Sequence, residues 1–200
     1  MSSRRVVLAS SNAGKLREFS ELLANQGFSL SRQSDFGIEP PPETGTTFLE
    51  NALIKARNAA RVTGLPAIAD DSGIEVDALG GAPGVYSARY AGENASDEAN
   101  LEKLLGALAG KPIDERRARY RAVVVYVRDA EDAAPLVGEG AWEGRLIEAR
   151  RGSGGFGYDP SFVPEGDTRT VAEMPQDEKN RKSHRAQALA AFLAQFSRGG

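Results

Sequence analysis

The first thirty residues join a short apolar run to a helical pattern through a polar turn, and this combination is typical of a β-α unit. Val6-Val7-Leu8-Ala9 is bounded by serines and an asparagine, which predicts a buried strand. Large apolar side chains then recur at helical spacing from Leu16 to Leu23, and Gly27 stands where a glycine commonly ends a helix. The beginning of the chain therefore favours an α/β fold.

The alternation of strand and helix patterns continues along the chain. Thr47 and Glu50 have the spacing of a capping box, which predicts a helix that continues to residue 63. Ser96 begins another helical pattern, and the last helix is expected at about 183–196. Further strands are expected at 67–69, 119–128, 136–137 and 142–147, and a proline-containing loop at 34–45. Interleaved helices and strands, with several strands in succession after residue 119, predict an α/β fold with a mixed sheet.

Charge and composition exclude several classes of protein. The 200 residues carry 25 Lys+Arg and 28 Asp+Glu, and this near-neutral balance argues against a generally basic protein that binds nucleic acid. No apolar run approaches the roughly 20 residues that span a bilayer, and the first residues lack a signal-peptide pattern, so we expect a cytoplasmic protein without a membrane partner. The absence of cysteine excludes disulfides and thiolate chemistry, and a single histidine, His184, argues against a histidine zinc site.

The turn between the first strand and helix has the composition of a phosphate-binding turn. It consists of Ser10, Ser11, Asn12, Ala13, Gly14 and Lys15. A helix N-terminus presents free N–H groups and a dipole that favours an anion, and the lysine adds a cation. The spacing of a Walker A loop is absent, and an ordinary N-cap is an equally good interpretation of the turn alone.

Two adjacent carboxylates, Asp70 and Asp71, follow the apolar run at 67–69 and precede Ser72 and Gly73. We expect them at the carboxyl end of a strand, where open α/β sheets usually bind ligands. Neighbours on an extended chain point in opposite directions, so one carboxylate can face a ligand while the other braces the fold. Carboxylate oxygens suit Mg²⁺, although a plain Asp-Ser-Gly turn is the alternative.

Two further segments carry residues suited to a nucleotide. The stretch 152–160 combines glycines with Phe156 and Tyr158, which could stack on a flat ring or could instead belong to the core. Four cations lie within 179–185, which we expect at a helix start, where cations oppose the helix dipole unless an anion binds. A solvated basic face is the alternative. Taken together, the segments fit a nucleoside triphosphate.

The segments SSNAGKLREF, ENALIKA, AIADDSGIEVDALGGAPGVYSARYAG, GGFGYDPSF and EKNRKSHRAQAL occur in the order and spacing of one family. From about residue 6 to 195 the chain resembles the inosine triphosphate pyrophosphatases, also called dITP/XTP or non-standard purine NTP pyrophosphatases. The resemblance implies one domain over 1–200 with an elongated two-lobed α/β fold, a long mixed central sheet flanked by helices, and an active-site cleft between the lobes. It also implies a homodimer that hydrolyses ITP, dITP and XTP to the monophosphate and pyrophosphate with Mg²⁺, which keeps deaminated purines out of DNA and RNA.

The resemblance also assigns roles to individual residues. Asp71 matches the proton acceptor and a metal ligand, with Asp70 as its acidic neighbour, and Glu43 matches a second metal ligand. Substrate contacts are implied at Ser10, Ser11, Asn12, Ala13, Gly14, Lys15, Lys55, Ser72, Phe156, Gly157, Tyr158, Asp159, Lys179, His184 and Arg185. Without the resemblance Lys55 would be interpreted as a surface lysine at the border of a helix face.

Two other functions fit parts of the pattern. A module that senses nucleotides without turnover would keep the glycine-rich loops and the basic residues, but it would not need the acid pair Asp70-Asp71. A pyrophosphatase of the septum-inhibitor type would share the general architecture with another base preference. The SHR segment at 183–185 and the FGYD segment at 156–159 argue against that second alternative.

Overall fold

A single mixed sheet forms the framework of the computed structural model, which describes residues 4–24 and 26–196. Its strand order is β2-β1-β3-β4-β5-β6. The strands are β1 (Arg4–Leu8), β2 (Phe28–Arg32), β3 (Ala67–Val76), β4 (Arg117–Val127), β5 (Leu136–Leu146) and β6 (Phe162–Pro164). β1 pairs in parallel with β2 and β3, whereas β5 and β6 are antiparallel. The expected α/β fold with a mixed sheet is confirmed.

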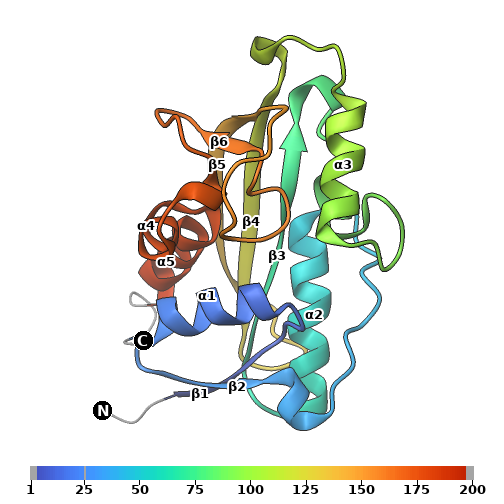
Figure 1. Ribbon diagram of the computed structural model, residues 1–200. Helices are drawn as coiled ribbons and strands as arrows, with labels where there is room; N and C mark the ends of the chain where they lie inside the picture. The colour runs from blue at the N-terminus through green and yellow to red at the C-terminus, as the bar shows by residue number, and fades with distance from the viewer. Residues whose placement is uncertain (1–3, 25, 197–200) are drawn as a thin grey trace. The chain divides into compact units, whose positions relative to one another are not determined.

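Five α-helices accompany the sheet among the described residues (Figure 1). They are α1 (Ala13–Leu23), α2 (Phe48–Thr63), α3 (Asp97–Ala107), α4 (Gln176–Lys182) and α5 (His184–Phe196). The side chains of Asn12, Thr47 and Ser96 cap α1, α2 and α3, and Thr47 forms the expected capping box with Glu50. None of the described helices is long and apolar enough to cross a membrane.

The chain divides into two compact units. Unit 1 contains the described residues of 1–71, 122–140 and 185–200, and unit 2 contains 72–121 and 141–184. β3, β4 and β5 each contribute residues to both units.

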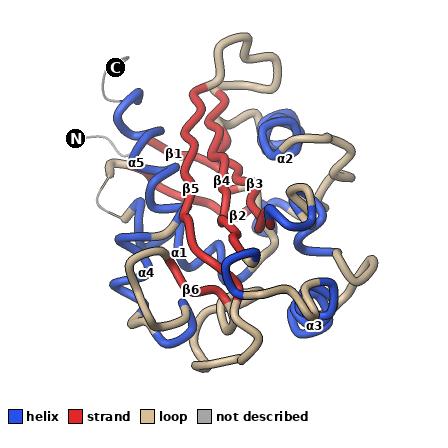
Figure 2. The backbone as a smooth tube through the Cα atoms, turned by 90° about the horizontal axis from the view of Figure 1, so that it is seen from above, coloured by secondary structure: helices blue, strands red, loops and turns tan. Residues whose placement is uncertain are grey.

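Unit 1 has helices on both faces of its strands. In the two views α1 and α5 lie on one side of β1 and β3, and α2 lies on the other side (Figures 1 and 2). Phe19 and Leu23 of α1 and Phe192 of α5 pack with Leu8 and Ile68 in one hydrophobic cluster. The other face meets α2 through small side chains, because Ala52, Ala56, Ala59 and Ala60 of this helix are buried. Functional groups of different helices can therefore reach opposite faces of β3.

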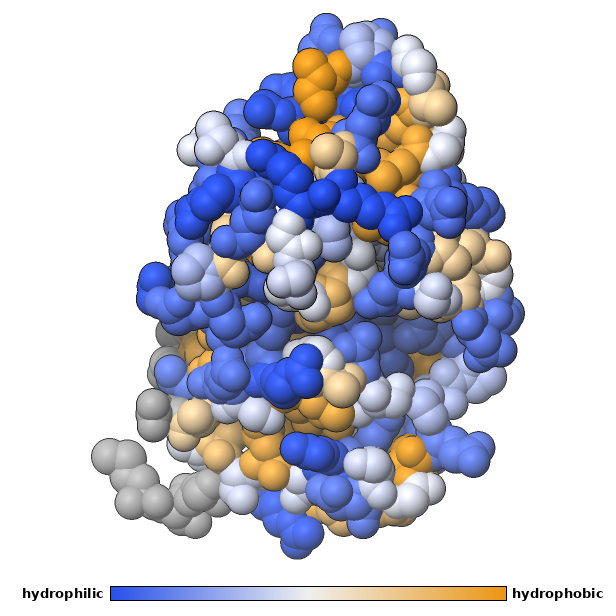
Figure 3. All heavy atoms as spheres, in the orientation of Figure 1, coloured by the Kyte–Doolittle hydropathy of each residue, from blue (hydrophilic) through white to orange (hydrophobic). Residues whose placement is uncertain are grey.

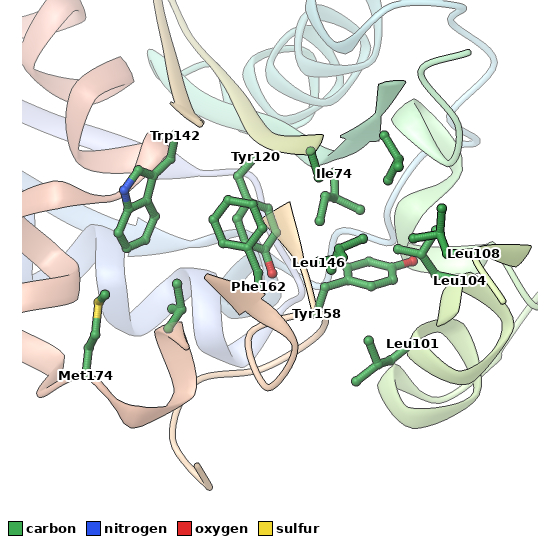
Figure 4. Close-up of a cluster of buried hydrophobic side chains, with 13 residues drawn as sticks. Ile74, Leu101, Leu104, Leu108, Tyr120, Trp142, Leu146, Tyr158, Phe162 and Met174 are labelled. Atoms are coloured by element: carbon green, nitrogen blue, oxygen red, sulfur yellow. The ribbon is translucent and has the colours of Figure 1, made fainter. Parts of the chain in front are cut away.

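Unit 2 contains an aromatic core on one face of its strands (Figure 4). Tyr120 and Phe162 meet edge to face with ring centroids 4.7 Å apart, and Trp142 contacts Phe162 in the same way. Leucines of α3 and the ring of Tyr158 complete this cluster. Edge-to-face pairs of this kind add about 0.5–1.5 kcal/mol beyond the buried area, so the core stabilises the strands of unit 2.

The face in Figure 3 is hydrophilic over most of its area, with separate hydrophobic patches. Among the described residues the large hydrophobic side chains that remain exposed are Val62, Tyr86 and Ile113. Single exposed apolar side chains are normal in a folded protein.

The structure corrects several element boundaries. The strand expected at 67–69 continues to Val76, so the acid pair lies inside β3 and not in a turn after it. The segments 136–137 and 142–146 belong to one strand, β5, because Gly138 and Gly140 are buried in it and do not interrupt the ladder, whereas Ile147 lies one residue beyond its end. α1 ends at Leu23, four residues before Gly27. β2, β6 and α4 are too short or too polar for their patterns to stand out in the sequence, and they were not predicted.

We expect Gly138→Ala to destabilise unit 1. A Cβ at residue 138 would lie 2.6 Å from the Phe192 nitrogen and against the Ala188 carbonyl, so α5 would have to move away from β5. Overpacking of this kind costs about 1–3 kcal/mol, which denaturant unfolding would measure. Gly106→Ala in α3 is the matched control, because its Cβ would enter open space and should be neutral or slightly stabilising. An unchanged unfolding midpoint for Gly138→Ala would contradict the close helix–strand packing.

Candidate functional site

The acid pair of β3 is buried, and each carboxylate has a different set of partners. Asp70 is 1% exposed and Asp71 is 5% exposed. Asp70 contacts residues of α1 and α5, whereas Asp71 contacts residues of α2. This division follows from the extended backbone, on which neighbouring side chains point to opposite faces of the sheet.

Asp70 forms ion pairs with two cations. Its Oδ2 lies 2.9 Å from Nζ of Lys15 and 3.5 Å from Nε of Arg185. Arg185 in turn donates from Nη1 to Oε2 of Glu18 at 2.6 Å. These four side chains form a buried cluster of two positive and two negative charges, which we call the α1–α5 charge cluster.

Asp71 belongs to a second charge cluster on the α2 side. Nζ of Lys55 donates to Oδ1 of Asp71 at 2.9 Å and to Oε1 of Glu43 at 3.0 Å. Asn51, one helical turn before Lys55, approaches Oδ2 of Asp71 at 3.4 Å. Glu43, Lys55 and Asp71 together carry a net charge of −1 when ionised.

The environments of the two aspartates move their pKa values apart. Burial raises the pKa of Asp70, but Lys15, Arg185 and Lys55 outweigh burial and lower this pKa to about 2. Burial also raises the pKa of Asp71, and there the lysines do not outweigh it, so the pKa of Asp71 stays above its ordinary value. Asp70 is therefore a fixed negative charge, whereas Asp71 is the better proton acceptor of the pair.

The lysines respond to the same clusters. Burial lowers the pKa of Lys55, but Asp71, Asp70 and Glu43 more than compensate and the pKa is raised overall. For Lys15 burial is the larger effect, and its pKa is lowered although Asp70 opposes the change. Both ammonium groups lie beside carboxylates, at positions where the family resemblance implies contacts with a triphosphate.

The expected phosphate-binding turn starts α1. Asn12 is the N-cap, and its Oδ1 accepts a hydrogen bond from the Lys15 nitrogen at 3.0 Å. Ser11, Asn12 and Ala13 are exposed, so this helix N-terminus is open to solvent. The N-cap is confirmed, and it still leaves helix N–H groups that can receive an anion, so phosphate binding by this turn stays a prediction.

The second group of expected site residues is centred on Asp159 in unit 2. Its Oδ2 accepts from Nζ of Lys179 and from the Phe156 nitrogen, each at 2.9 Å, and its Oδ1 accepts from the Tyr120 hydroxyl at 2.9 Å. The Lys179 ammonium lies over the Phe156 ring, 4.5 Å from its centroid. The His184 ring stacks on Tyr120 with centroids 4.7 Å apart. Asp159 thus positions an aromatic ring and a buried cation.

Three expected site residues have surroundings that differ from the sequence prediction. Lys179 lies in the last turn of α4 and not before a helix, so the dipole favours it there. Tyr158 is in the core, and its hydroxyl donates to the Ser87 carbonyl. Arg185 lies in the first turn of α5, directly after His184, but Glu18 and Asp70 compensate its charge, so its position needs no bound anion. Gly157 donates its N–H to Asp97, and Ser72 is half-buried in β3.

Three residues that contact the expected site residues were not predicted from the sequence. They are Glu18, Asn51 and Tyr120. Glu18 lies one helical turn after Lys15 and Asn51 one turn before Lys55, so helical spacing could have suggested both. The apolar alternation of the β4 sequence indicates that Tyr120 is buried, but it does not reveal a contact with Asp159, which is 39 residues away.

The unit 1 residues provide donors for a divalent cation. Among the residues that the structure describes, no group of three or more histidine, cysteine, aspartate or glutamate side chains could hold a metal ion. Glu43 and Asp71 nevertheless both lie within about 3 Å of the Lys55 nitrogen. Mg²⁺ needs only one or two carboxylates when substrate phosphates complete its coordination, and this donor pair fits that requirement.

Comparison with known proteins identifies the family. The family model described as the Ham1 family matches residues 6–195. The chain belongs to the Ham1 family. It is 58% identical to a Methylococcus capsulatus protein named dITP/XTP pyrophosphatase over 193 residues, which cover 96% of each chain. A protein of the same name from Shigella flexneri is 54% identical, with 98% of this chain and 100% of that protein covered.

Solved Ham1 structures show the same fold. A HAM1 protein from Coxiella burnetii has a TM-score of 0.90 and 45% sequence identity, and the match covers 98% of this chain and all of that one. The Staphylococcus aureus Ham1 protein has a TM-score of 0.85 and 39% identity with the same coverage. The resemblance inferred from the sequence motifs is therefore confirmed over nearly the whole chain.

Proposed function

We propose that this Ham1 protein hydrolyses deaminated purine nucleoside triphosphates, namely dITP, ITP and XTP, to the nucleoside monophosphate and pyrophosphate. The names of its relatives at 53–58% identity support this substrate class. The observation that carries the reaction is the acid pair of β3, in which Asp70 and Asp71 are held by different lysines. A module that only binds nucleotides has no need of two buried carboxylates with separated pKa values.

The unit 1 residues are proposed to bind the triphosphate and activate water. Lys15 and the start of α1 supply positive charge and N–H groups for phosphate oxygens, and Lys55 supplies a second ammonium. Ser10 to Gly14 would contact phosphate through the backbone of this turn, and Ser72 of β3, which belongs to unit 2, would be a further contact. Asp71 orients and deprotonates the water that attacks the α-phosphorus, because its pKa is raised whereas Asp70 stays ionised.

A divalent cation is proposed as the cofactor, with Mg²⁺ as the natural choice for oxygen donors and phosphates. Asp71 and Glu43 would hold it, and when bound it would neutralise phosphate charge and fix the phosphate geometry. The net charge of −1 on Glu43, Lys55 and Asp71 suits a cation at this position.

The unit 2 residues are proposed to contact the base. The Phe156 ring offers a flat surface for a purine, and Lys179 and His184 carry N–H groups. A donor favours hypoxanthine and xanthine, whose 6-oxo group accepts, over adenine, whose 6-amino group donates. Gly157, Tyr158 and Asp159 shape this loop. Arg185, which belongs to the α1–α5 charge cluster, is proposed as a further substrate contact.

We also propose that the protein is a homodimer and works in the cytoplasm, where nucleotide pools turn over. The homodimer rests on the family resemblance, and the cytoplasmic location rests on the absence of a signal-peptide pattern and of a bilayer-length apolar run in the sequence. Keeping deaminated purines out of DNA and RNA would be the consequence of this activity.

The assay that tests the function compares ITP, dITP, XTP, GTP and ATP with separate detection of pyrophosphate and orthophosphate. We expect pyrophosphate as the first product, rapid turnover of ITP, dITP and XTP, little turnover of ATP, and complete loss of activity with a chelator that Mg²⁺ restores. Orthophosphate as first product, or equal turnover of ATP and ITP, would refute the assignment.

A further inference from the structure

The α1–α5 charge cluster contains an acid that no step of the proposed reaction uses. Glu18 is 3% exposed and lies on α1, three residues after Lys15. Its Oε2 accepts from Nη1 of Arg185 at 2.6 Å. A buried carboxylate beside a site for a highly charged anion opposes binding by its charge, so its presence requires a physical reason.

The contacts of Arg185 supply that reason. Lys15 and Arg185 both approach the same atom of Asp70, Oδ2, at 2.9 Å and 3.5 Å. The longer distance belongs to Arg185, whose guanidinium is shared with Glu18. Without the charge of Glu18, Arg185 would be drawn to Asp70 and would compete with Lys15 for that oxygen. The two positive and two negative charges also balance, so loss of one acid leaves a net positive charge in a buried place.

We propose that Glu18 is a positioning residue for triphosphate binding: it holds Arg185 away from the Asp70 oxygen that fixes the Lys15 ammonium at the start of α1. The proposal rests on the phosphate-binding role of Lys15 given above. Glu18 acts through Arg185 and Asp70 and does not touch the substrate. Asp71 and Lys55 lie on the other side of β3 and keep their own contacts, so the chemical step should be spared.

The two possible effects of Glu18→Gln on anion binding have opposite signs, so a binding measurement distinguishes them. If Glu18 acted only through its charge, removing that charge would strengthen the binding of an anion. If Glu18 positions Lys15, the variant must order the lysine upon binding, which weakens binding about five- to tenfold for one flexible side chain. Titration of inorganic tripolyphosphate by calorimetry measures this directly and needs no turnover.

We expect Glu18→Gln to weaken tripolyphosphate binding by about five- to tenfold and to raise the KM for dITP by a similar factor, with kcat changed less than about threefold. Glu18→Asp, which keeps the charge, should recover most of the affinity. Glu21→Gln, an exposed acid of the same helix, is the matched control and should bind like the wild type. Tighter binding in Glu18→Gln, or a loss in kcat alone, would overturn the proposal.

A double-mutant cycle separates positioning from general damage to the fold. Because Glu18 acts through Arg185, Glu18→Gln should have little further effect on tripolyphosphate binding once Arg185→Gln is present. Additive losses would overturn the proposal, as would equal losses in Glu18→Gln and Glu18→Asp. If the wild type binds tripolyphosphate but releases no pyrophosphate from any purine triphosphate, the proposed function fails while the role of Glu18 in anion binding is still decided by the cycle.

Discussion

Asp71→Asn should lower kcat for dITP hydrolysis by about 10²–10⁴-fold, the usual range for loss of a general base. Asparagine keeps the shape of the side chain but cannot accept a proton at neutral pH. The fold should remain intact, because Lys55 keeps its ion pair with Glu43 at 3.0 Å and is not left as an unpaired buried charge. Metal affinity should fall as well, since the variant removes a charged oxygen donor.

The measurement is steady-state release of pyrophosphate over a Mg²⁺ series, with thermal unfolding as a control for the fold. Asp114→Asn, an exposed aspartate of unit 2, is the matched substitution and should leave kcat unchanged. A near-normal rate for Asp71→Asn at saturating Mg²⁺ would instead assign proton transfer to Asp70 or Glu43.

Asp70→Asn should mainly reduce stability, by about 3–5 kcal/mol, which is typical when one partner of a buried ion pair is removed. Lys15 would lose the carboxylate at 2.9 Å, and Arg185 would lose one of its carboxylate partners. Asp71→Asn leaves no comparable stranded cation. The effects of the two neighbouring substitutions should therefore differ. Asp70→Asn should cause the larger loss of stability, and Asp71→Asn should cause the larger loss of catalytic rate.

The stability difference between wild type and Asp70→Asn should also depend on pH with a defined sign. The pKa of Asp70 is lowered to about 2 in the folded protein, below its ordinary value. The stability that the ionised Asp70 contributes is therefore fully present above about pH 4. It is lost as the pH falls towards 2, where the folded state also takes up the proton.

Denaturant unfolding of both proteins between pH 2 and 7 measures this difference. We expect the difference in unfolding free energy between wild type and Asp70→Asn to be constant near neutral pH and to become smaller in the acid range. A gap that stays constant down to pH 2, or a variant as stable as the wild type at pH 7, would show that Asp70 is not held by the two cations. Lys15→Met combined with Asp70→Asn should cost less than the two separate losses added together.

Much of the fold could be predicted because its local signals are strong. The capping box at Thr47 and Glu50 and the cap at Ser96 are formed as expected, since a polar side chain three residues before an unpaired N–H satisfies it locally. The apolar run at 6–9 is a buried strand for the same kind of local reason. β6 has three residues and α4 has seven, and such short elements are stabilised by their tertiary contacts and not by a sequence pattern.

The candidate site was predictable in its residue types but not in its pairings. The sequence suggested that Asp70 and Asp71 point in opposite directions, and their separate partners agree. It could not show that the aspartates lie inside a strand, because carboxylates are normally excluded from buried strands unless cations pair with them. Those cations are 16 to 115 residues away in the sequence, and no local pattern connects Glu18 with Arg185.

The acid pair inside β3 also has a consequence for folding. The side chains of a strand alternate with a period of two, so a slip of one residue would turn Asp70 towards Lys55 of α2 and Asp71 towards Lys15 and Arg185. Small residues such as Ala67 and Ala69 would resist such a slip only weakly by their shape. Charge complementarity on both faces of β3 also favours the correct register. After a one-residue slip, each carboxylate would meet a number of cations that does not match its native environment. The two carboxylates to which we assign the chemistry would thus also select the register in which β3 enters the sheet.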